Sequence, residues 1–280
     1  MGRLGIIAGE GEIVDLAVEA LQNQGETPYV IDITGGDTLA RLSGIEGEVC
    51  GVGQVGRVIK ALKKAGVDRV LFLGKVDKRL LYRRKRVDLR AMKLLLSLKD
   101  FNDDTILNAV IEELSKEGMR VVGQKEVLGD LVPGPGFLGG VSPDDKVMAD
   151  VAFGFSVARR VGEIGIGQTV VVKDRSVVAV EAVEGTDETI RRGGNLAGYG
   201  VVVVKVKRPS QSPLLDVPTV GMRTLETLRE VGGRALAVEA GETLVLGLEE
   251  MAREAEKAGI TLLAVDDVFL ERRGREGLGP

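Results

Sequence analysis

The first half of the chain alternates short apolar segments with segments of helical periodicity. Residues 3–8, 28–33 and 69–73 are apolar runs of strand length. Apolar side chains recur every three or four residues across residues 13–21 and 55–65, as they do on one face of a helix. Strands joined by helices form parallel sheets through right-handed crossovers. The sequence therefore predicts a Rossmann-like parallel sheet flanked by helices.

The same alternation continues up to a segment rich in proline and glycine. We expect helices over residues 89–98 and from the polar triplet 102–104 to residue 114, and a strand over residues 119–122. Residues 131–140 hold two prolines and four glycines, a composition typical of linkers. We therefore predict an N-terminal domain of residues 1–131, a linker of residues 132–142 and a C-terminal catalytic domain of residues 143–280.

Helices and strands follow one another less regularly after this segment. A hairpin of residues 168–173 and 176–181 is expected to turn at Asp174 and Arg175. We further expect helices over residues 144–161, 225–231 and 249–258, and strands over residues 201–206, 235–239, 243–248 and 261–265. This order predicts a mixed α/β domain, and it leaves the strand topology open.

The chain contains no histidine and one cysteine in 280 residues, which excludes whole classes of catalytic site. Serine and cysteine nucleophiles activated by histidine, and zinc sites with histidine ligands, all need an imidazole. Any catalysis must use carboxylates supported by hydroxyls, lysine and arginine, and such groups favour a hard cation such as Mg²⁺. A buried apolar role is expected for Cys50.

The formal net charge of −4 gives no electrostatic reason to expect nucleic acid as a partner. A basic run from Lys78 to Arg86 is the exception. It fits a solvated helix face, and it also fits attraction to an anionic membrane surface or a phosphate group. Neither a transmembrane segment nor a signal peptide is recognised, so we expect a soluble, cytoplasmic protein.

Two glycines follow the first expected strand and open the first expected helix. Gly9 and Gly11 resemble a nucleotide-binding turn, but position 14 is valine where the dinucleotide fingerprint has its third glycine. Contact with a ligand and a plain tight turn both fit this pattern. A nicotinamide-dependent oxidoreductase, with Asp32 as the ribose partner, is one reading of it.

Acidic residues gather in the turns of the second half. Thr186 or Asp187 is a natural helix cap in Glu184-Gly-Thr-Asp187. Capping does not explain why Glu181, Glu184 and Asp187 lie beside Arg191 and Arg192, where acids could bind a cation and guanidinium groups a phosphate. Asp216 lies among prolines and fits either a turn or an anionic site that it shares with Lys205 and Lys207.

Several of these segments resemble, in order along the chain, the UDP-2,3-diacylglucosamine pyrophosphatases of the LpxI type. They are Leu4-Gly-Ile-Ile-Ala-Gly9, Gly53-Gln-Val-Gly56, Phe72-Leu-Gly-Lys-Val76, Asp103-Asp-Thr-Ile-Leu107, Gly165-Ile-Gly-Gln168, Val180-Glu-Ala-Val-Glu-Gly-Thr-Asp187, Asp216-Val-Pro-Thr-Val-Gly221 and Val238-Glu-Ala-Gly241. The family often has three consecutive glycines in the first turn, whereas Glu10 interrupts them here.

The resemblance implies Mg²⁺-dependent hydrolysis of the pyrophosphate of UDP-2,3-diacylglucosamine to UMP and 2,3-diacylglucosamine 1-phosphate (lipid X), a step of lipid A biosynthesis. It implies that Asp216 is catalytic and a Mg²⁺ ligand. The expected substrate-binding residues are Gly9, Gly11, Lys75, Gln168, Glu184, Thr186, Asp187, Arg191, Lys205 and Thr219. The acyl chains imply peripheral contact with the inner membrane surface, and a homodimer is one option for the assembly. The alternative is a non-catalytic protein of the same fold that binds nucleotide sugars or lipids.

Overall fold

The computed structural model describes residues 2–74, 87–98, 103–209, 214 and 217–276. The chain forms two compact units. The first contains residues 1–128 with the segment 213–215, and the second contains residues 129–212 and 216–280.

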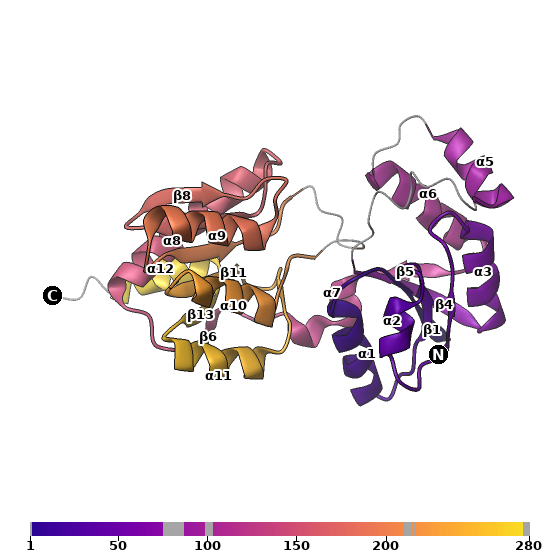
Figure 1. Ribbon diagram of the computed structural model, residues 1–280, viewed down its shortest axis with the longest axis horizontal. Coiled ribbons are helices and arrows are strands. Elements are labelled where there is room, and N and C mark those ends of the chain that lie inside the picture. Colours follow the sequence, from indigo (N-terminus) through magenta and orange to yellow (C-terminus); the bar gives the residue numbers. More distant parts are fainter. Residues whose placement is uncertain (1, 75–86, 99–102, 210–213, 215–216, 277–280) are drawn as a thin grey trace. The chain divides into compact units, whose positions relative to one another are not determined.

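The first unit is built on a five-stranded parallel sheet with the strand order β3-β2-β1-β4-β5 (Figure 1). Its strands are β1 (Arg3–Ala8), β2 (Tyr29–Asp32), β3 (Gly47–Val49), β4 (Val67–Leu73) and β5 (Arg120–Val122). Its helices are α1 (Ile13–Asn23), α2 (Asp37–Arg41), α3 (Val55–Lys64), α5 (Leu89–Ser97), α6 (Asp103–Lys116) and α7 (Gln124–Val127). The predicted Rossmann-like sheet is confirmed, and the apolar run of β1 is explained because Leu4 and Ile6 are both fully buried.

The second unit contains a six-stranded mixed sheet with the order β6-β13-β11-β9-β7-β8. Strands β9, β11 and β13 are parallel, whereas β6, β7 and β8 pair antiparallel with their neighbours. The strands are β6 (Gly136–Gly140), β7 (Thr169–Lys173), β8 (Ser176–Val180), β9 (Val202–Lys205), β11 (Ala235–Glu239) and β13 (Thr261–Val265). A separate parallel pair is formed by β10 (Thr219–Val220) and β12 (Leu244–Val245).

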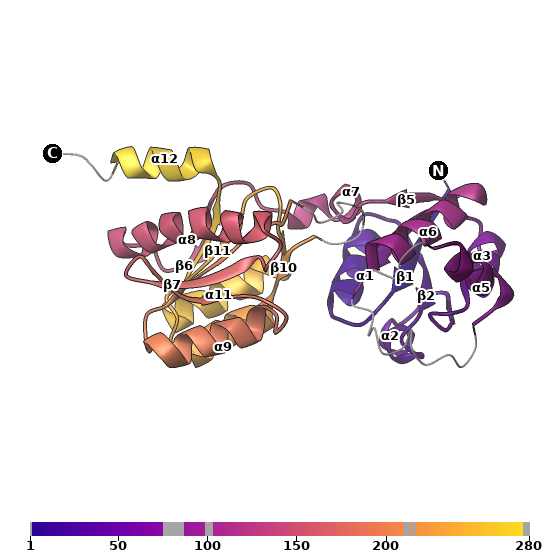
Figure 2. The same cartoon turned by 90° about the horizontal axis from the view of Figure 1, so that it is seen from above.

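Helices cover both faces of this second sheet. Figure 2 shows α8 and α12 on one side and α9 and α11 on the other. The helices are α8 (Asp145–Glu163), α9 (Thr186–Ala197), α10 (Met222–Glu230), α11 (Leu248–Ala258) and α12 (Asp267–Glu276), and a 3₁₀ turn, η1, covers Gly129–Leu131. Successive residues of β9 belong to the hydrophobic cores on opposite faces of the sheet. Val203 packs on the face covered by α9 and α10, and Val202 and Val204 pack against α8. The expected mixed α/β architecture is confirmed, with valine on both faces of the central strands.

The segment expected to be a linker has a different role in part of its length. Residues 136–140 form strand β6, which pairs antiparallel with β13 inside the second sheet. A Cβ atom at Gly139 would lie 2.4 Å from the Cβ of Ala252 in α11, and one at Gly140 would lie 1.9 Å from the carbonyl oxygen of Ile260. Both glycines also have positive φ angles. Glycine is therefore required here for close packing of a strand, and not for flexibility.

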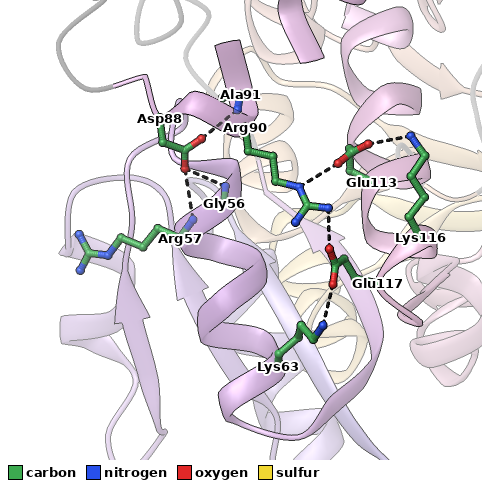
Figure 3. A network of polar contacts seen from close by, with 9 residues as sticks. All are labelled: Gly56, Arg57, Lys63, Asp88, Arg90, Ala91, Glu113, Lys116 and Glu117. Carbon is green, nitrogen blue, oxygen red and sulfur yellow. Dashed lines mark hydrogen bonds and ion pairs between the residues drawn. The ribbon is translucent and has the colours of Figure 1, made fainter. Parts of the chain in front are cut away.

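A network of polar contacts fastens α5 to its neighbours in the first unit (Figure 3). The Asp88 carboxylate accepts hydrogen bonds from Ala91 N at 2.8 Å and from Gly56 N at 2.7 Å, so it caps the first turns of both α5 and α3. Arg90 forms ion pairs with Glu113 on α6 at 2.8 Å and with Glu117, the residue that follows α6, at 2.7 Å. The position of α5 is thus set by contacts with the backbone of α3 and with acidic side chains at the end of α6.

Within the part of the chain that the structure describes, none of the helices combines the length and the apolar character needed to cross a bilayer.

Candidate functional site

Polar side chains from three adjacent strands meet at one edge of the second sheet. Lys205 ends β9 and lies opposite Thr169, the first residue of β7. Glu181 directly follows β8, and its amide donates a hydrogen bond of 2.8 Å to the carbonyl of Thr169. Because β9 is parallel to β11 and β13, this is the edge at which parallel strands end, where ligands of open α/β sheets bind.

A chain of hydrogen bonds connects the charged groups of this edge. The Lys205 ammonium donates to Thr186 Oγ1 at 3.0 Å and to the carbonyl oxygen of Thr219 at 2.9 Å. The Thr186 hydroxyl in turn donates to Glu181 Oε1 at 3.1 Å. Lys205 and Glu181 are only 6% and 7% exposed, so both charges lie in an environment where water screens them little.

Two acceptor atoms at this edge lack a partner among the described residues. Glu181 Oε2 and Gln168 Oε1 are both buried and accept no hydrogen bond there. Buried polar atoms of native proteins nearly always have a partner, so each exception needs an explanation. A cation or a hydrogen-bond donor of a ligand would satisfy either oxygen.

Glycine lets the strand ends come close together. A Cβ atom at Gly167 would lie 2.0 Å from the carbonyl oxygen of Glu181. Helix α9 begins above these strands, and its residues Gly193 and Gly194 leave no room for a Cβ against Val171 and Val231. The helix that carries Thr186 therefore lies unusually close to strand β7 and to the end of α10.

The expected cap at Thr186 or Asp187 is wrong. Gly185, with a φ angle of 84°, is the residue before α9, and no side chain caps the helix. The Thr186 hydroxyl is used by Glu181 and Lys205 instead. The Thr186 side chain therefore bonds Glu181 and Lys205 and does not cap the helix.

Glu184 is held near the start of α9 by several donors. It accepts hydrogen bonds from Ala182 N at 3.1 Å and Thr189 Oγ1 at 3.3 Å, and it pairs with Arg192 at 2.6 Å. Its own amide and Arg192 hold the pKa of Glu184 below its ordinary value. Glu184 thus supports the turn that leads from Glu181 to Thr186.

Three of the expected substrate-binding residues meet at the Lys205 ammonium, and others lie elsewhere. Thr186 and Thr219 contact Lys205 directly. Asp187 is paired with Arg223 at 2.8 Å, and Arg191 is paired with Glu188 at 2.7 Å. The structure brings neither Asp187 nor Arg191 into the hydrogen-bond chain that ends at Lys205.

The remaining expected residues lie in the first unit or outside the described residues. Gly9 and Gly11 form the turn between β1 and α1, where Gly11 has a φ angle of 118° and the Gly9 carbonyl accepts a hydrogen bond from Thr38. Lys75 and Asp216 are outside the described residues. The residue that follows Asp216 in sequence, Val217, is buried.

Asp32 does not face a ligand as the oxidoreductase reading required. It is fully buried, and its carboxylate accepts hydrogen bonds from Thr34 N and Leu39 N, both at 2.7 Å. Burial alone would raise the pKa of Asp32, but these hydrogen bonds outweigh it and hold the pKa below its ordinary value. The carboxylate closes the turn between β2 and α2, so it offers no free oxygen to a ribose.

The carboxylates of this edge meet the needs of Mg²⁺ only in part. No group of three or more acidic or cysteine side chains suited to a metal occurs within the described ranges. Mg²⁺ usually binds one or two carboxylates and completes its octahedron with substrate phosphates and water. The free, buried Oε2 of Glu181 fits one such ligand.

Two residues of this site were not selected from the sequence. Glu181 was grouped with other acids but not singled out, and Thr169 looked like the start of an apolar strand. Their significance comes from strand register, because β7 brings Thr169 between Lys205 and Glu181. The alternation of apolar and polar residues along one strand does not tell which residues of the adjacent strands lie beside it.

Fold and site define an α/β protein of two units with a buried lysine among hydroxyl and carboxylate groups, a combination suited to an anionic ligand. Models of the LpxI N-terminal domain and the LpxI C-terminal domain match residues 3–131 and 134–263. The chain is 35% identical to the UDP-2,3-diacylglucosamine pyrophosphatase LpxI of Caulobacter vibrioides, over 95% of this chain and 98% of that protein. The chain therefore belongs to the LpxI family.

Solved structures share much less with the chain. Biotin carboxylase of Campylobacter jejuni is 13% identical over 70% of this chain and 42% of its own, with a TM-score of 0.29. The N5-carboxyaminoimidazole ribonucleotide synthetase of Thermotoga maritima is 17% identical over 66% of this chain and 42% of its own, with a TM-score of 0.24. No conclusion about fold or function follows from scores this low.

Proposed function

We propose that the chain is a hydrolase that cleaves the pyrophosphate bond of UDP-2,3-diacylglucosamine, a reaction of lipid A biosynthesis. The products would be UMP and 2,3-diacylglucosamine 1-phosphate. The observation that supports this most strongly is the 35% identity to a pyrophosphatase of that name over nearly the full length of both proteins. Identity of this extent includes both units of the chain.

The chemistry of the second unit agrees with this proposal. A pyrophosphate is an anion whose charge shifts onto the leaving phosphate as the bond breaks, so a fixed ammonium in a buried site lowers the barrier. Lys205 is such a group, and Thr186 and the Thr219 carbonyl fix its direction. The chain has no histidine, so carboxylates are the available bases for the attacking water.

We also propose Mg²⁺ as the cofactor, with Asp216 as its ligand. When bound, Mg²⁺ supplies charge neutralisation and lowers the pKa of a coordinated water. The protein residues would orient the substrate around it, with Lys205 at the phosphates and Gln168 offering its unpaired oxygen as an acceptor. Peripheral contact with a membrane surface belongs to the same proposal, because the substrate carries two acyl chains. We propose a homodimer as the assembly.

The proposal is tested by measuring UMP release from UDP-2,3-diacylglucosamine with Mg²⁺, after chelation, and with single variants. We expect wild-type turnover that chelation abolishes and added Mg²⁺ restores. Lys205→Met should lower kcat by about 100-fold, the usual effect of removing one group that stabilises developing charge. Asp216→Ala should abolish turnover.

Lys207→Met is the matched control for Lys205→Met. Lys207 is two residues further along, and its ammonium is paired with Glu242 at 2.8 Å. We expect this variant to keep wild-type turnover. Binding of the substrate without UMP release by the wild type, with any divalent cation, would instead identify a non-catalytic binding protein.

A further inference from the structure

We infer that Glu181 is a positioning residue, which directs the Lys205 ammonium through the Thr186 hydroxyl. This inference rests on the proposed function, because it concerns the group that would stabilise the leaving phosphate. The relevant contacts are Lys205 Nζ to Thr186 Oγ1 at 3.0 Å and Thr186 Oγ1 to Glu181 Oε1 at 3.1 Å.

The chemistry of the three groups allows these hydrogen bonds only one direction. An ammonium can only donate, and a hydroxyl has a single proton. Once Thr186 gives that proton to the Glu181 carboxylate, its lone pairs point to Lys205. Without the carboxylate, the hydroxyl keeps a longer contact with Thr169 Oγ1, at 3.4 Å, and would lose its fixed orientation.

Backbone structure fixes Glu181 independently of the lysine. Its amide is bonded to Thr169, and Thr169 is the register partner of Lys205. Gly167 allows the Glu181 backbone to approach within a distance that a side chain would prevent. The position of Glu181 is therefore fixed by the sheet. Of the three hydrogen-bonded residues Glu181, Thr186 and Lys205, Thr186 comes from a helix and the other two from the sheet edge.

Glu181 is poorly suited to a purely structural role. Its Oε2 has no hydrogen-bond partner among the described residues, although the side chain is buried. An unpaired buried oxygen costs folding free energy, so this carboxylate adds little net stability. Asp150, in α8, shows the contrast: it is equally buried, and its two oxygens accept hydrogen bonds from Asp174 N at 3.0 Å and Arg175 N at 2.5 Å.

The test combines steady-state kinetics with unfolding of the full-length protein. Glu181→Met removes the acceptor but keeps the volume of the side chain. We expect kcat to fall by about 10- to 100-fold, a usual loss when a catalytic group is misplaced. KM and the midpoint of unfolding should change little. Asp150→Asn is the matched control, with the opposite expectation of lower stability and unchanged kcat.

A double-mutant cycle separates positioning from direct contact with the substrate. Thr186→Val breaks the same hydrogen-bond chain, so the double variant Glu181→Met/Thr186→Val should be no slower than the slower single variant. Thr186→Ser keeps the hydroxyl and should keep most of the wild-type kcat. If the two losses multiply, Glu181 acts independently of Thr186 and the inference is wrong.

Two further outcomes are also decisive. A folded Glu181→Met protein with wild-type kcat would overturn the inference while leaving the proposed function intact. A wild type that does not hydrolyse the substrate would overturn the proposed function itself. If Glu181→Met does not fold, the same cycle is measured with Glu181→Ala, and failure of both variants to fold would show that the carboxylate is needed for stability, against the inference.

Discussion

Asp32 shows how a buried carboxylate shapes the first unit. It ends β2 and accepts hydrogen bonds from the amides of Thr34 and Leu39 and from the Thr34 hydroxyl. A carboxylate that accepts several such bonds is stabilised in its charged form. Its negative charge therefore contributes to the stability of the turn into α2.

We predict that Asp32→Asn lowers the free energy of unfolding by about 1 to 3 kcal/mol at neutral pH, because an amide cannot accept all these hydrogen bonds. The pKa of Asp32 is lowered by folding. Its contribution is therefore complete above the unfolded value of about 4 and is lost as the pH falls through the folded pKa. Urea unfolding of both proteins should show a difference that shrinks below about pH 4. A difference that is constant with pH would contradict this.

Thr186 marks the limit of local sequence reasoning for single residues. A threonine before a helical segment predicts a cap, and that prediction uses only its immediate neighbours. The actual partners are Glu181, five positions before it, and Lys205, 19 positions after it. The residue types and their grouping were visible in the sequence, but the hydrogen bonds depend on how β7, β8 and β9 pair.

At the level of elements, α9 depends on two glycines, of which Gly193 faces strand β7 and Gly194 faces the end of helix α10. An added Cβ at Gly193 would lie 2.6 Å from Val171 Cγ1, and one at Gly194 would lie 2.3 Å from Val231 Cβ. Real Cβ atoms do not approach other side chains this closely, so a larger residue must displace α9 or the neighbour that it meets. The position of Thr186 would move with the helix.

We predict that overpacking in Gly193→Ala lowers the free energy of unfolding by about 1 to 3 kcal/mol. The higher helix propensity of alanine offsets about 1 kcal/mol of this loss. Turnover should also fall, because α9 carries Thr186. Asn195→Ala, at an exposed position of the same helix, is the control and should be neutral or slightly stabilising. Thermal unfolding measures the effect on stability, and UMP release measures the effect on turnover. A Gly193→Ala protein as stable as the control would show that the sheet shifts to make room for the added methyl group, against the prediction.

Some elements were predictable because their signals are local. The hairpin turn at Asp174 and Arg175 is where the sequence places it, and both residues adopt the positive φ angles that such tight turns need. Strand β6 was missed because glycine and proline normally indicate a turn. Its glycines are required by α11 and by the carbonyl of Ile260, and neither contact is visible in the segment itself.

At the level of the whole molecule, the parallel sheet was predictable and the mixed sheet only in outline. Strands that alternate with helices permit few arrangements, so the first unit followed from its pattern. In the second unit, β6 pairs with β13, more than 120 residues later in the chain, and this pairing joins the start and the end of the unit. No periodicity in the sequence encodes a partner so distant.

Helix α5 presents the apolar surface best suited to the proposed membrane contact. Leu89, Met92 and Leu96 are 75%, 45% and 81% exposed, and their spacing of three and four residues places them on one face of the helix. Asp88 and Arg90 hold the helix against α3 and α6 (Figure 3). The exposed apolar side chains are therefore not needed to keep α5 in place. The basic run Lys78–Arg86 precedes it in sequence.

We predict that the protein cosediments with vesicles that contain anionic lipid, and that added salt weakens the association because basic residues contribute to it. The double variant Leu89→Ser/Leu96→Ser should weaken it by about 10-fold or more, since each leucine contributes through the apolar area that it buries in the bilayer interface. The control is Ile164→Ser/Ile166→Ser, which removes two exposed isoleucines from the second unit. Equal losses in both double variants would mean that apolar exposure in general, and not α5, determines the association.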